Sequence, residues 1–260
     1  MRYDLHNHTW RCNHAVGSMD EYVQKAIEQG LEGFGFACHA PMAFDEENRM
    51  ALAELESYKR DVLELKERYV GLCDIKLGLE VDYLPGFMEE EVLQFEGDYL
   101  IGSIHFLGDW GFDNPAFLAE YAKRDINESW RRYLEGIVAM AQSGHFDIVG
   151  HFDLMKVFGF RPTEDLRSEI EQALRAIKRA GMVIELNASG LRKKVAEPYP
   201  GESILQMAGA LEIPITFSSD SHAPEHVGFE RVRLENLAKQ AGYTHYTIFT
   251  HREKESLKIP

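Results

Sequence analysis

Several side chains that can bind metal ions occur in pairs two residues apart. The 260-residue chain has 11 histidines, and His6 and His8 stand two apart near its start, within Asp4-Leu5-His6-Asn7-His8. Asp220 and His222 repeat this spacing near its end. Because side chains alternate along a strand, residues two apart point to the same side. Each pair therefore offers two donors to one site if it lies on a strand.

Single donors stand at the ends of four further predicted strands, namely His39, Glu80, His105 and His151. In a parallel barrel the carboxyl ends of all strands meet at one face, where active sites are built. Any one of these histidines alone is more often an ordinary core or surface residue. Together, buried donors without partners would cost several kcal/mol each, and metal ions are their simplest common partner.

The donors outnumber the needs of one metal ion. A catalytic zinc takes about three protein ligands and a water, so we predict two or three divalent ions, with Glu80 bridging. Imidazole and carboxylate ligands suit Zn, Mn, Fe or Co. Paired ions activate a shared water and neutralise a phosphoryl group. The remaining histidines lack this placement and are expected to be solvated: His145, His226, His245 and His251.

Alternating strand-like and helical segments must position these donors. Strands are predicted over Tyr3–His8, Gly33–His39, Ile75–Tyr83, Tyr99–Phe106, Asp147–Asp153, Met182–Ala188, Ile213–Asp220 and Thr244–Thr250. Helices are predicted from Ser18 to Gly30, over Leu55 to Tyr69, and from Thr163 to Gly181. Ser18 and Glu21 have the spacing of a capping box, and Gly30 and Gly181 are typical C-terminal stops.

This alternation predicts an α/β fold with a closed parallel barrel. Apolar strands separated by amphipathic helices are typical of a parallel sheet covered by helices. Seven or eight such units with no change of composition favour one TIM-like barrel domain over residues 1–260. The segment Phe106–Ser129 has the least regular pattern and is expected to include an active-site loop.

Composition limits the partners of the chain. It has 28 Lys and Arg against 43 Asp and Glu, and its net charge of -15 disfavours nucleic acid. With 45% hydrophobic residues it is expected to fold, and no apolar run is long enough to span a membrane. The start of the chain leaves no room for a signal peptide. Three cysteines without a paired motif indicate a reducing cytoplasm. The oligomeric state stays open.

These motifs resemble the PHP (polymerase and histidinol phosphatase) superfamily, and most closely its histidinol-phosphatase branch. The resemblance extends over essentially the whole chain, from Asp4-Leu5-His6-Asn7-His8-Thr9 to Ser219-Asp220-Ser221-His222. It implies a distorted (β/α)7 barrel that holds three metal ions. The first ion would take His6, His8, Glu80 and Asp220, the second Glu80, His105 and His151, and the third His14, His39 and His222. His14 is assigned by the resemblance alone.

One residue departs from the family pattern. The family usually has Asp before the histidine that ends the second strand, whereas this chain has Cys38 before His39. A neutral thiol packed beside the ligand is the favoured interpretation. The alternative is a thiolate ligand of the third ion, which leaves the identity and occupancy of that ion open.

The resemblance implies a metal-dependent phosphomonoesterase that converts L-histidinol phosphate to L-histidinol and phosphate. A hydroxide bridging two ions would attack phosphorus in line, because no nucleophilic Ser or Cys motif is evident. Glu80 and Asp220 are the predicted catalytic residues. Arg192 is the first candidate for holding the phosphate and Arg49 the second.

Two other functions remain open. The chain could be a PHP phosphoesterase for another ester, such as a nucleotide, a sugar phosphate or a nucleic-acid end. It could also be a non-catalytic domain in which metal ions only stabilise the fold. A structural site needs only four closed ligands, so the larger donor set favours an enzyme with a small-molecule phosphate ester as substrate.

Overall fold

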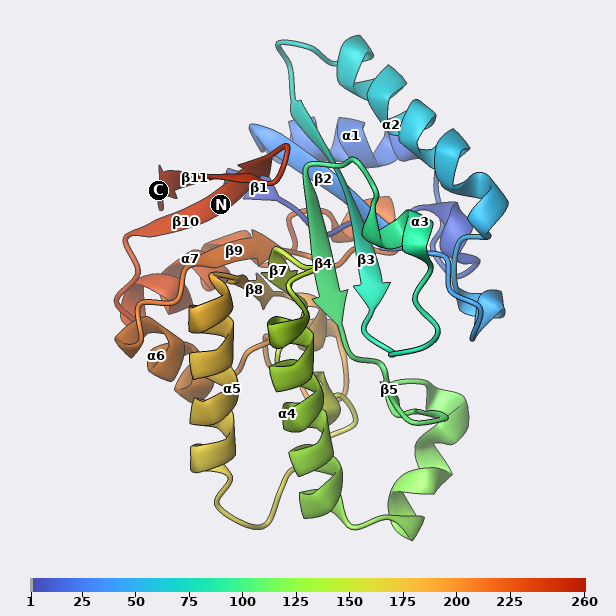
Figure 1. The fold of residues 1–260 in the computed structure, drawn as a ribbon. Helices are drawn as coiled ribbons and strands as arrows, with labels where there is room; N and C mark the ends of the chain where they lie inside the picture. The colour runs from blue at the N-terminus through green and yellow to red at the C-terminus, as the bar shows by residue number, and fades with distance from the viewer. Residues whose placement is uncertain (1) are drawn as a thin grey trace.

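The computed structural model describes residues 2–260 and shows a barrel of seven parallel strands (Figure 1). Neighbouring strands pair in the order β1-β2-β3-β4-β7-β8-β9, and every pairing is parallel. The strands are β1 (Tyr3–Asp4), β2 (Gly33–His39), β3 (Asp74–Asp82), β4 (Tyr99–Ser103), β7 (Ile148–Val149), β8 (Val183–Asn187) and β9 (Ile215–Ser218). The predicted barrel is therefore confirmed.

The barrel closes through the residues that follow β1. The backbone N–H of Leu5 donates to the carbonyl of Phe217 at 3.2 Å, and that of His8 donates to the carbonyl of Ser221 at 2.9 Å. Asn7 and Ser221 form a parallel bridge. Although β1 itself is only two residues long, His6 and His8 thus lie on backbone that is hydrogen-bonded to the last strand of the barrel.

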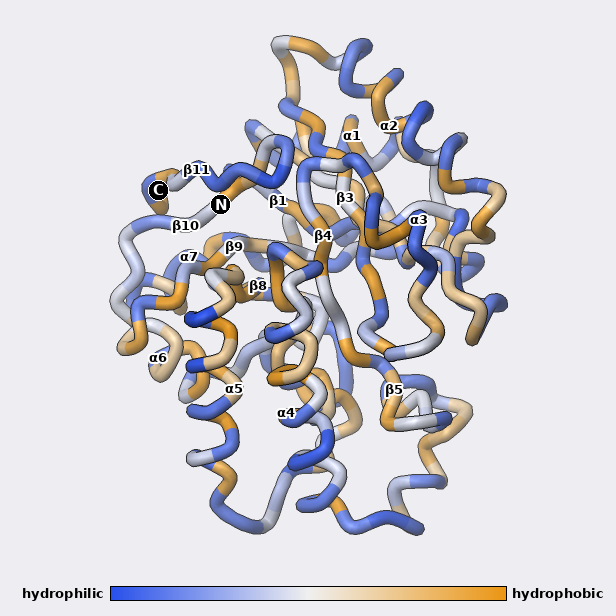
Figure 2. The backbone as a smooth tube through the Cα atoms, in the orientation of Figure 1, coloured by the Kyte–Doolittle hydropathy of each residue, from blue (hydrophilic) through white to orange (hydrophobic). Residues whose placement is uncertain are grey.

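Helices cover the outside of the barrel (Figure 1). They are α1 (Met19–Glu28), α2 (Leu55–Arg68), α3 (Glu90–Leu93), α4 (Ile126–Ser143), α5 (Arg167–Ala180), α6 (Glu202–Ala210) and α7 (Arg231–Gln240). The predicted capping box of α1 is present, since Ser18 and Glu21 bond each other's backbone N–H. Figure 2 shows hydrophilic and hydrophobic residues alternating along α4 and α5, as expected for helices with one buried face.

Some predicted boundaries were wrong, each for a local reason. The helix expected from Thr163 begins at Arg167, because the Asn127 side chain accepts bonds from the N–H groups of Thr163 and Glu164. The strand expected at Thr244–Thr250 is β10 (His245–Thr250), which pairs antiparallel with β11 (Glu253–Lys258) outside the barrel. This leaves seven barrel strands.

The predicted irregular segment contains short regular pieces. Its first part is a hairpin of β5 (Phe106–Leu107) and β6 (Trp110–Gly111), followed by a 3-10 helix over Pro115–Lys123. Helix α4 then begins inside the segment, with Asp125 accepting bonds from the N–H groups of its first turn. The loop that follows β4 therefore consists of a short hairpin and a 3-10 helix at the carboxyl end of that strand.

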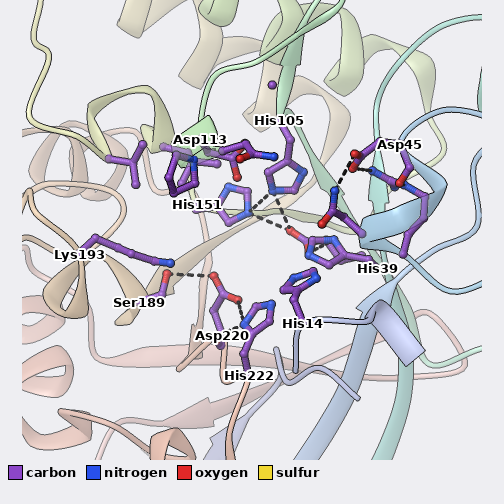
Figure 3. Close-up of a pocket in the computed structure, with 18 of the residues that line it drawn as sticks. His14, His39, Asp45, His105, Asp113, His151, Ser189, Lys193, Asp220 and His222 are labelled. Atoms are coloured by element: carbon purple, nitrogen blue, oxygen red, sulfur yellow. Dashed lines mark hydrogen bonds and ion pairs between the residues drawn. The ribbon is translucent and has the colours of Figure 1, made fainter. Parts of the chain in front are cut away.

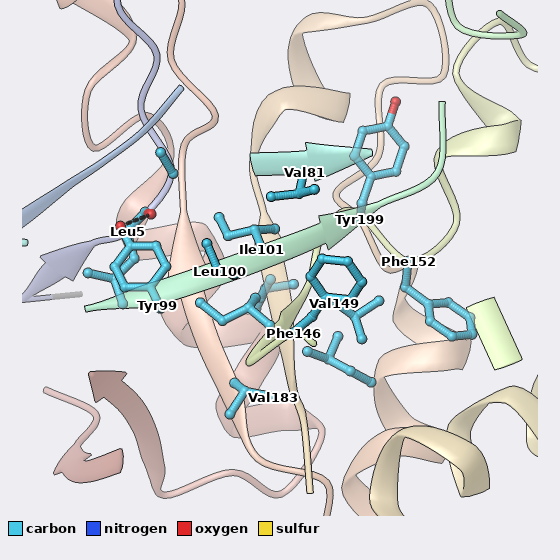
Figure 4. Packing of buried hydrophobic residues seen from close by; sticks show 14 of the residues in the cluster. Leu5, Val81, Tyr99, Leu100, Ile101, Phe146, Val149, Phe152, Val183 and Tyr199 are labelled. Carbon is cyan, nitrogen blue, oxygen red and sulfur yellow. Dashed lines mark hydrogen bonds between the residues drawn. The ribbon is translucent and has the colours of Figure 1, made fainter. Parts of the chain in front are cut away.

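Packing inside the barrel holds the β1 segment in place (Figure 4). The buried Tyr99 hydroxyl donates to the carbonyl of Leu5 at 2.5 Å, next to His6. Tyr99 fits only because Gly78 lies opposite on β3; a Cβ there would lie 2.4 Å from the tyrosine ring. Ile101 and its register partner Ile148 are buried on the same side of the sheet as Tyr99.

No described helix is long and apolar enough to cross a membrane.

Candidate metal centre

The predicted ligands meet at the carboxyl ends of the barrel strands, around a cavity of about 590 Å³ (Figure 3). Seven of the nine line this cavity, namely His14, His39, Glu80, His105, His151, Asp220 and His222. The other two, His6 and His8, are fully buried and contact Glu80. The structure therefore brings all nine together, although they come from segments spread over most of the chain.

The Glu80 carboxylate is the centre of this cluster. Its Oε2 lies 3.3 Å from His6 Nε2, 3.6 Å from His8 Nε2 and 3.0 Å from His39 Nδ1. Burial alone would raise the pKa of Glu80, but the surrounding histidines, His39 first, hold it well below its ordinary value. Glu80 is therefore an anion shared by rings from separate strands.

The other Glu80 oxygen faces a second group of ligands. Oε1 is 2.8 Å from His151 Nε2 and 3.6 Å from His105 Nε2, and it accepts a bond of 2.7 Å from the Ser103 hydroxyl. One carboxylate thus has one oxygen in each of two donor groups. This is the placement expected of the bridging ligand that the sequence suggested.

Asp220 is turned into the cavity by its backbone. Its φ of 51° lies in the left-handed region, which an L-residue adopts only when the surroundings require it. Its Oδ1 lies 3.2 Å from His8 Nε2, while Oδ2 accepts bonds from Ser189 Oγ at 2.9 Å and Asn187 Nδ2 at 3.2 Å. These bonds fix both carboxylate oxygens.

His14, His39 and His222 form a third, more exposed group. The ring centroids of His14 lie 4.8 Å from His222 and 5.3 Å from His39. Burial and the neighbouring histidines lower the pKa of His14 to about 4 and also lower the pKa values of His39 and His222. All three rings are thus held neutral, the form of imidazole that binds metal ions.

Two carboxylates hold ligand histidines from behind. Asp82 Oδ1 lies 2.6 Å from His105 Nδ1. Glu185 Oε1 lies 2.6 Å from His6 Nδ1, and its Oε2 accepts the backbone N–H of His151 at 2.8 Å. A carboxylate on one ring nitrogen leaves the other nitrogen free for a metal ion.

The role of Glu185 was missed in the sequence. A signal was present, because Glu185 and Asn187 are polar residues two apart in the apolar strand β8. Such spacing places both on one side of the strand. Both are fully buried here, where they reach His6 and Asp220.

The donors fit divalent metal ions. His6 Nε2 lies 3.1 Å from His8 Nε2, and His105 Nε2 lies 3.2 Å from His151 Nε2. Two ring nitrogens this close need a proton or a cation between them. Donor atoms within 4.8 Å of one another form groups that could hold an ion, among them His6, His8 and Glu80, and His8, His39 and His222.

The two candidate arginines differ in how many donors they have free. Arg192 lines the cavity, and its Nη2 donates to the carbonyls of Ser219 and Asp220, both at 2.9 Å. Its buried Nη1 has no partner among residues 2–260. Arg49 instead pairs with Asp82 at 2.9 Å and Asp45 at 3.1 Å. Arg192 is thus the better placed to meet an anion, and Arg49 supports Asp82.

Three further residues lie near the donors. His226 and Lys193 line the cavity, and Lys193 is exposed while His226 is partly exposed. Asp153 pairs with Lys156 at 2.7 Å and accepts the N–H of Gly201. His145, His245 and His251 are not among the lining residues.

Cys38 lies beside the ligands, away from the open cavity. Its sulfur accepts a bond from Thr9 Oγ1 at 3.2 Å and lies within 4.8 Å of Cys12 Sγ and a ring nitrogen of His8. Burial opposes ionisation, but contacts with Cys12, His8 and Thr9 hold the pKa of Cys38 well below its ordinary value. The geometry agrees with a thiol packed beside His8; its role stays a prediction.

Comparisons with known proteins show the family of the chain. The model of the PHP domain family matches residues 4–189. A protein of Deinococcus radiodurans named probable histidinol-phosphatase is 38% identical, covering 97% of this chain and 98% of its own length. The chain belongs to the PHP domain family.

Further PHP relatives agree in fold and extent. The histidinol-phosphatase of Bacillus subtilis is 32% identical over 87% of this chain and 95% of its own length. The histidinol phosphate phosphatase of Lactococcus lactis, solved with zinc, L-histidinol and phosphate, superposes with a TM-score of 0.84 at 22% identity, covering 98% of both chains. Asp220 and His222 lie beyond the matched PHP segment, yet they complete the same cavity.

We expect Glu185→Gln to weaken metal binding by about 10- to 100-fold, because His6 loses its charged partner. Metal titration of the chelated protein, followed by elemental analysis, measures this. Glu197→Gln is the matched control, since Glu197 pairs with Lys156 and Arg161 instead of a ligand. Equal metal affinity in both variants would refute the role of Glu185.

Proposed function

We propose that this chain is a metal-dependent phosphomonoesterase that hydrolyses L-histidinol phosphate to L-histidinol and phosphate, a step of histidine biosynthesis. The main support is that nine metal-type donors and the unpaired Nη1 of Arg192 meet at one cavity. The names of the relatives from Deinococcus radiodurans and Bacillus subtilis support the substrate, as do the molecules bound in the Lactococcus lactis structure.

The donors divide into three proposed ion sites, and Glu80 belongs to the first two. The sets are His6, His8, Glu80 and Asp220; Glu80, His105 and His151; and His14, His39 and His222. Zn, Mn, Fe or Co would suit these ligands. When bound, such ions neutralise phosphoryl charge and lower the pKa of water, which is the electrostatic help that phosphoryl transfer needs.

Arg192 is the proposed anchor for the phosphate. Two carbonyl bonds through Nη2 hold its guanidinium in place, and its stacking on Phe229, 5.1 Å from the ring centroid, fixes the plane. Nη1, which has no partner among residues 2–260, is the donor proposed for a phosphate oxygen. Charged hydrogen bonds of this kind are short and directional, so they also orient the ester.

Asp220 is the proposed residue for proton transfer. It faces the cavity, and its side chain is 13% exposed, against 1% for Glu80. Ser189 and Asn187 hold Oδ2, so that Oδ1 is the oxygen left facing His8 and the ester. Glu80 is enclosed by histidines. Its proposed role is to bind metal ions, and it does not transfer the proton.

Asp113 is the proposed partner of the positive end of the substrate. It lines the cavity on the loop after β6, and it forms no ion pair within residues 2–260. Burial raises its pKa, so the carboxyl gains from a cation such as the ammonium of histidinol phosphate. Asp45, which also lines the cavity, already pairs with Arg49.

We also propose that residues 1–260 act as one domain in the cytoplasm. The three cysteines are free, as is usual in a reducing compartment.

A substrate panel tests the proposed function. We expect the metal-loaded protein to turn over L-histidinol phosphate with a higher kcat/KM than nucleotides, sugar phosphates or oligonucleotide ends. Chelation should abolish turnover, and Glu80→Ala should not recover it when metal is restored. A higher kcat/KM on a nucleotide would refute the substrate. Metal that raises the melting temperature without any turnover would favour a non-catalytic domain.

Arg192→Ala is expected to lower kcat/KM for phosphate esters by about 10- to 100-fold, mainly through KM, since a charged hydrogen bond contributes about 1.5–3 kcal/mol. Metal content should not change. Arg161→Ala is the control, because Arg161 is exposed and pairs with Glu197. If the Arg192 variant loses metal in proportion to its activity, the phosphate role is wrong.

Asp113→Asn is expected to raise KM for L-histidinol phosphate by about tenfold, the loss of roughly one ion contact. Its KM for p-nitrophenyl phosphate, which lacks a cationic group, should stay the same. Asp109→Asn in the same hairpin is the matched control, because Asp109 is exposed. An equal loss on both esters would contradict recognition of the cation.

A further inference from the structure

Two thiols lie together behind the third ligand group. Cys12 ends a 3-10 helix over Trp10–Cys12, and Cys38 is the residue before the last of β2. Both are fully buried, and their sulfurs lie within 4.8 Å of each other. The two cysteines are 26 positions apart in the sequence, so only the fold brings them into contact.

Each thiol is linked directly to proposed metal ligands. The carbonyl of Cys12 lies 2.7 Å from His14 Nδ1, so it orients that ring. The sulfur of Cys12 lies within 4.8 Å of ring nitrogens of His14 and His222. Cys38 directly precedes His39 and lies beside His8. The two cysteines thus lie in direct contact with, or next in sequence to, the ligands of the third group.

The two sulfurs are near each other but are not at bonding distance. A disulfide needs an S–S separation of about 2.05 Å and Cα atoms about 4.4–6.8 Å apart. Closing the gap requires the two sulfurs to approach each other. Thr9, which precedes the short helix over Trp10–Cys12, contacts Cys38 through its N–H and hydroxyl, and both donate to the sulfur.

We propose that Cys12 and Cys38 form an oxidation site, at which a peroxide closes a disulfide that withdraws His14 and His39 from the third metal ion. Each thiol gives up one hydrogen, and the S–S bond forms. The peroxide O–O bond breaks, and its two oxygens leave as two waters with those hydrogens and the two electrons. Thiol–disulfide exchange with an added thiol reverses the bond.

The location of the pair favours a small oxidant. Cys12 and Cys38 have no exposed surface, and the partly exposed His14, His39 and His222 line the nearby cavity. Hydrogen peroxide is little larger than water, which makes it the oxidant best suited to approach them from the cavity. Cys73 is different, because it precedes β3 at the opposite end of the barrel.

Peptide mapping of peroxide-treated, zinc-loaded protein tests this proposal. Zinc has no redox chemistry, so peroxide starts no reaction at the metal, and the mapping separates thiol oxidation from oxidation of the nine methionines. After free thiols are blocked, we expect a Cys12–Cys38 cross-link, release of about one zinc per chain, and recovery of both after dithiothreitol and zinc. Cys73→Ser should behave as the unchanged protein, and Cys12→Ser and Cys38→Ser should each release no zinc.

Two outcomes would overturn the proposal. One is that Cys12 and Cys38 both stay open to alkylation after peroxide, and the other is a cross-link that leaves the zinc content unchanged. Mapping the unchanged protein decides the first even if a serine variant fails to fold. Neither readout needs a substrate, so a chain that forms the bond and loses zinc without hydrolysing histidinol phosphate would refute only the proposed function.

Discussion

The structure depends on keeping several buried carboxylates and imidazoles close together in the barrel. Glu80, Asp82 and Glu185 are all within a few per cent of full burial, and removal of such groups from water costs several kcal/mol each unless they are paired. The barrel meets this cost through cross-strand contacts, such as Glu185 to His6 and Asp82 to His105. The carboxylates that remain can bind metal ions. Such ions would allow the nine donors to lie close together without repelling one another.

Position on a parallel strand is the property that could be predicted from the sequence. His39 and Glu80 end runs with an unmistakable strand pattern, and the observed β2 has the predicted bounds Gly33–His39. Alternation was sufficient for His6 and His8, although regular strand structure ends at Asp4, because hydrogen bonds to β9 continue the extended backbone. The barrel itself followed from the number of such units.

Loop donors and tertiary partners could not be derived in the same way. His14 lies on irregular chain whose path depends on the helix over Trp10–Cys12, so no periodicity marks it. Asp113 follows a two-residue strand. It stands out as a candidate for binding a cation only once the ion pairs of the neighbouring carboxylates are known. Likewise Arg49 and Arg192 look alike in the sequence. Only the structure shows that Arg49 already forms ion pairs with Asp82 and Asp45.

Cys38 shows how a local exchange can be accommodated beside a demanding site. The sulfur of Cys38 accepts bonds from the N–H and hydroxyl of Thr9 at the position before a proposed ligand. The same position places this sulfur beside Cys12. A thiol here thus introduces chemistry that a carboxylate does not have, namely reversible oxidation next to the proposed metal ligands.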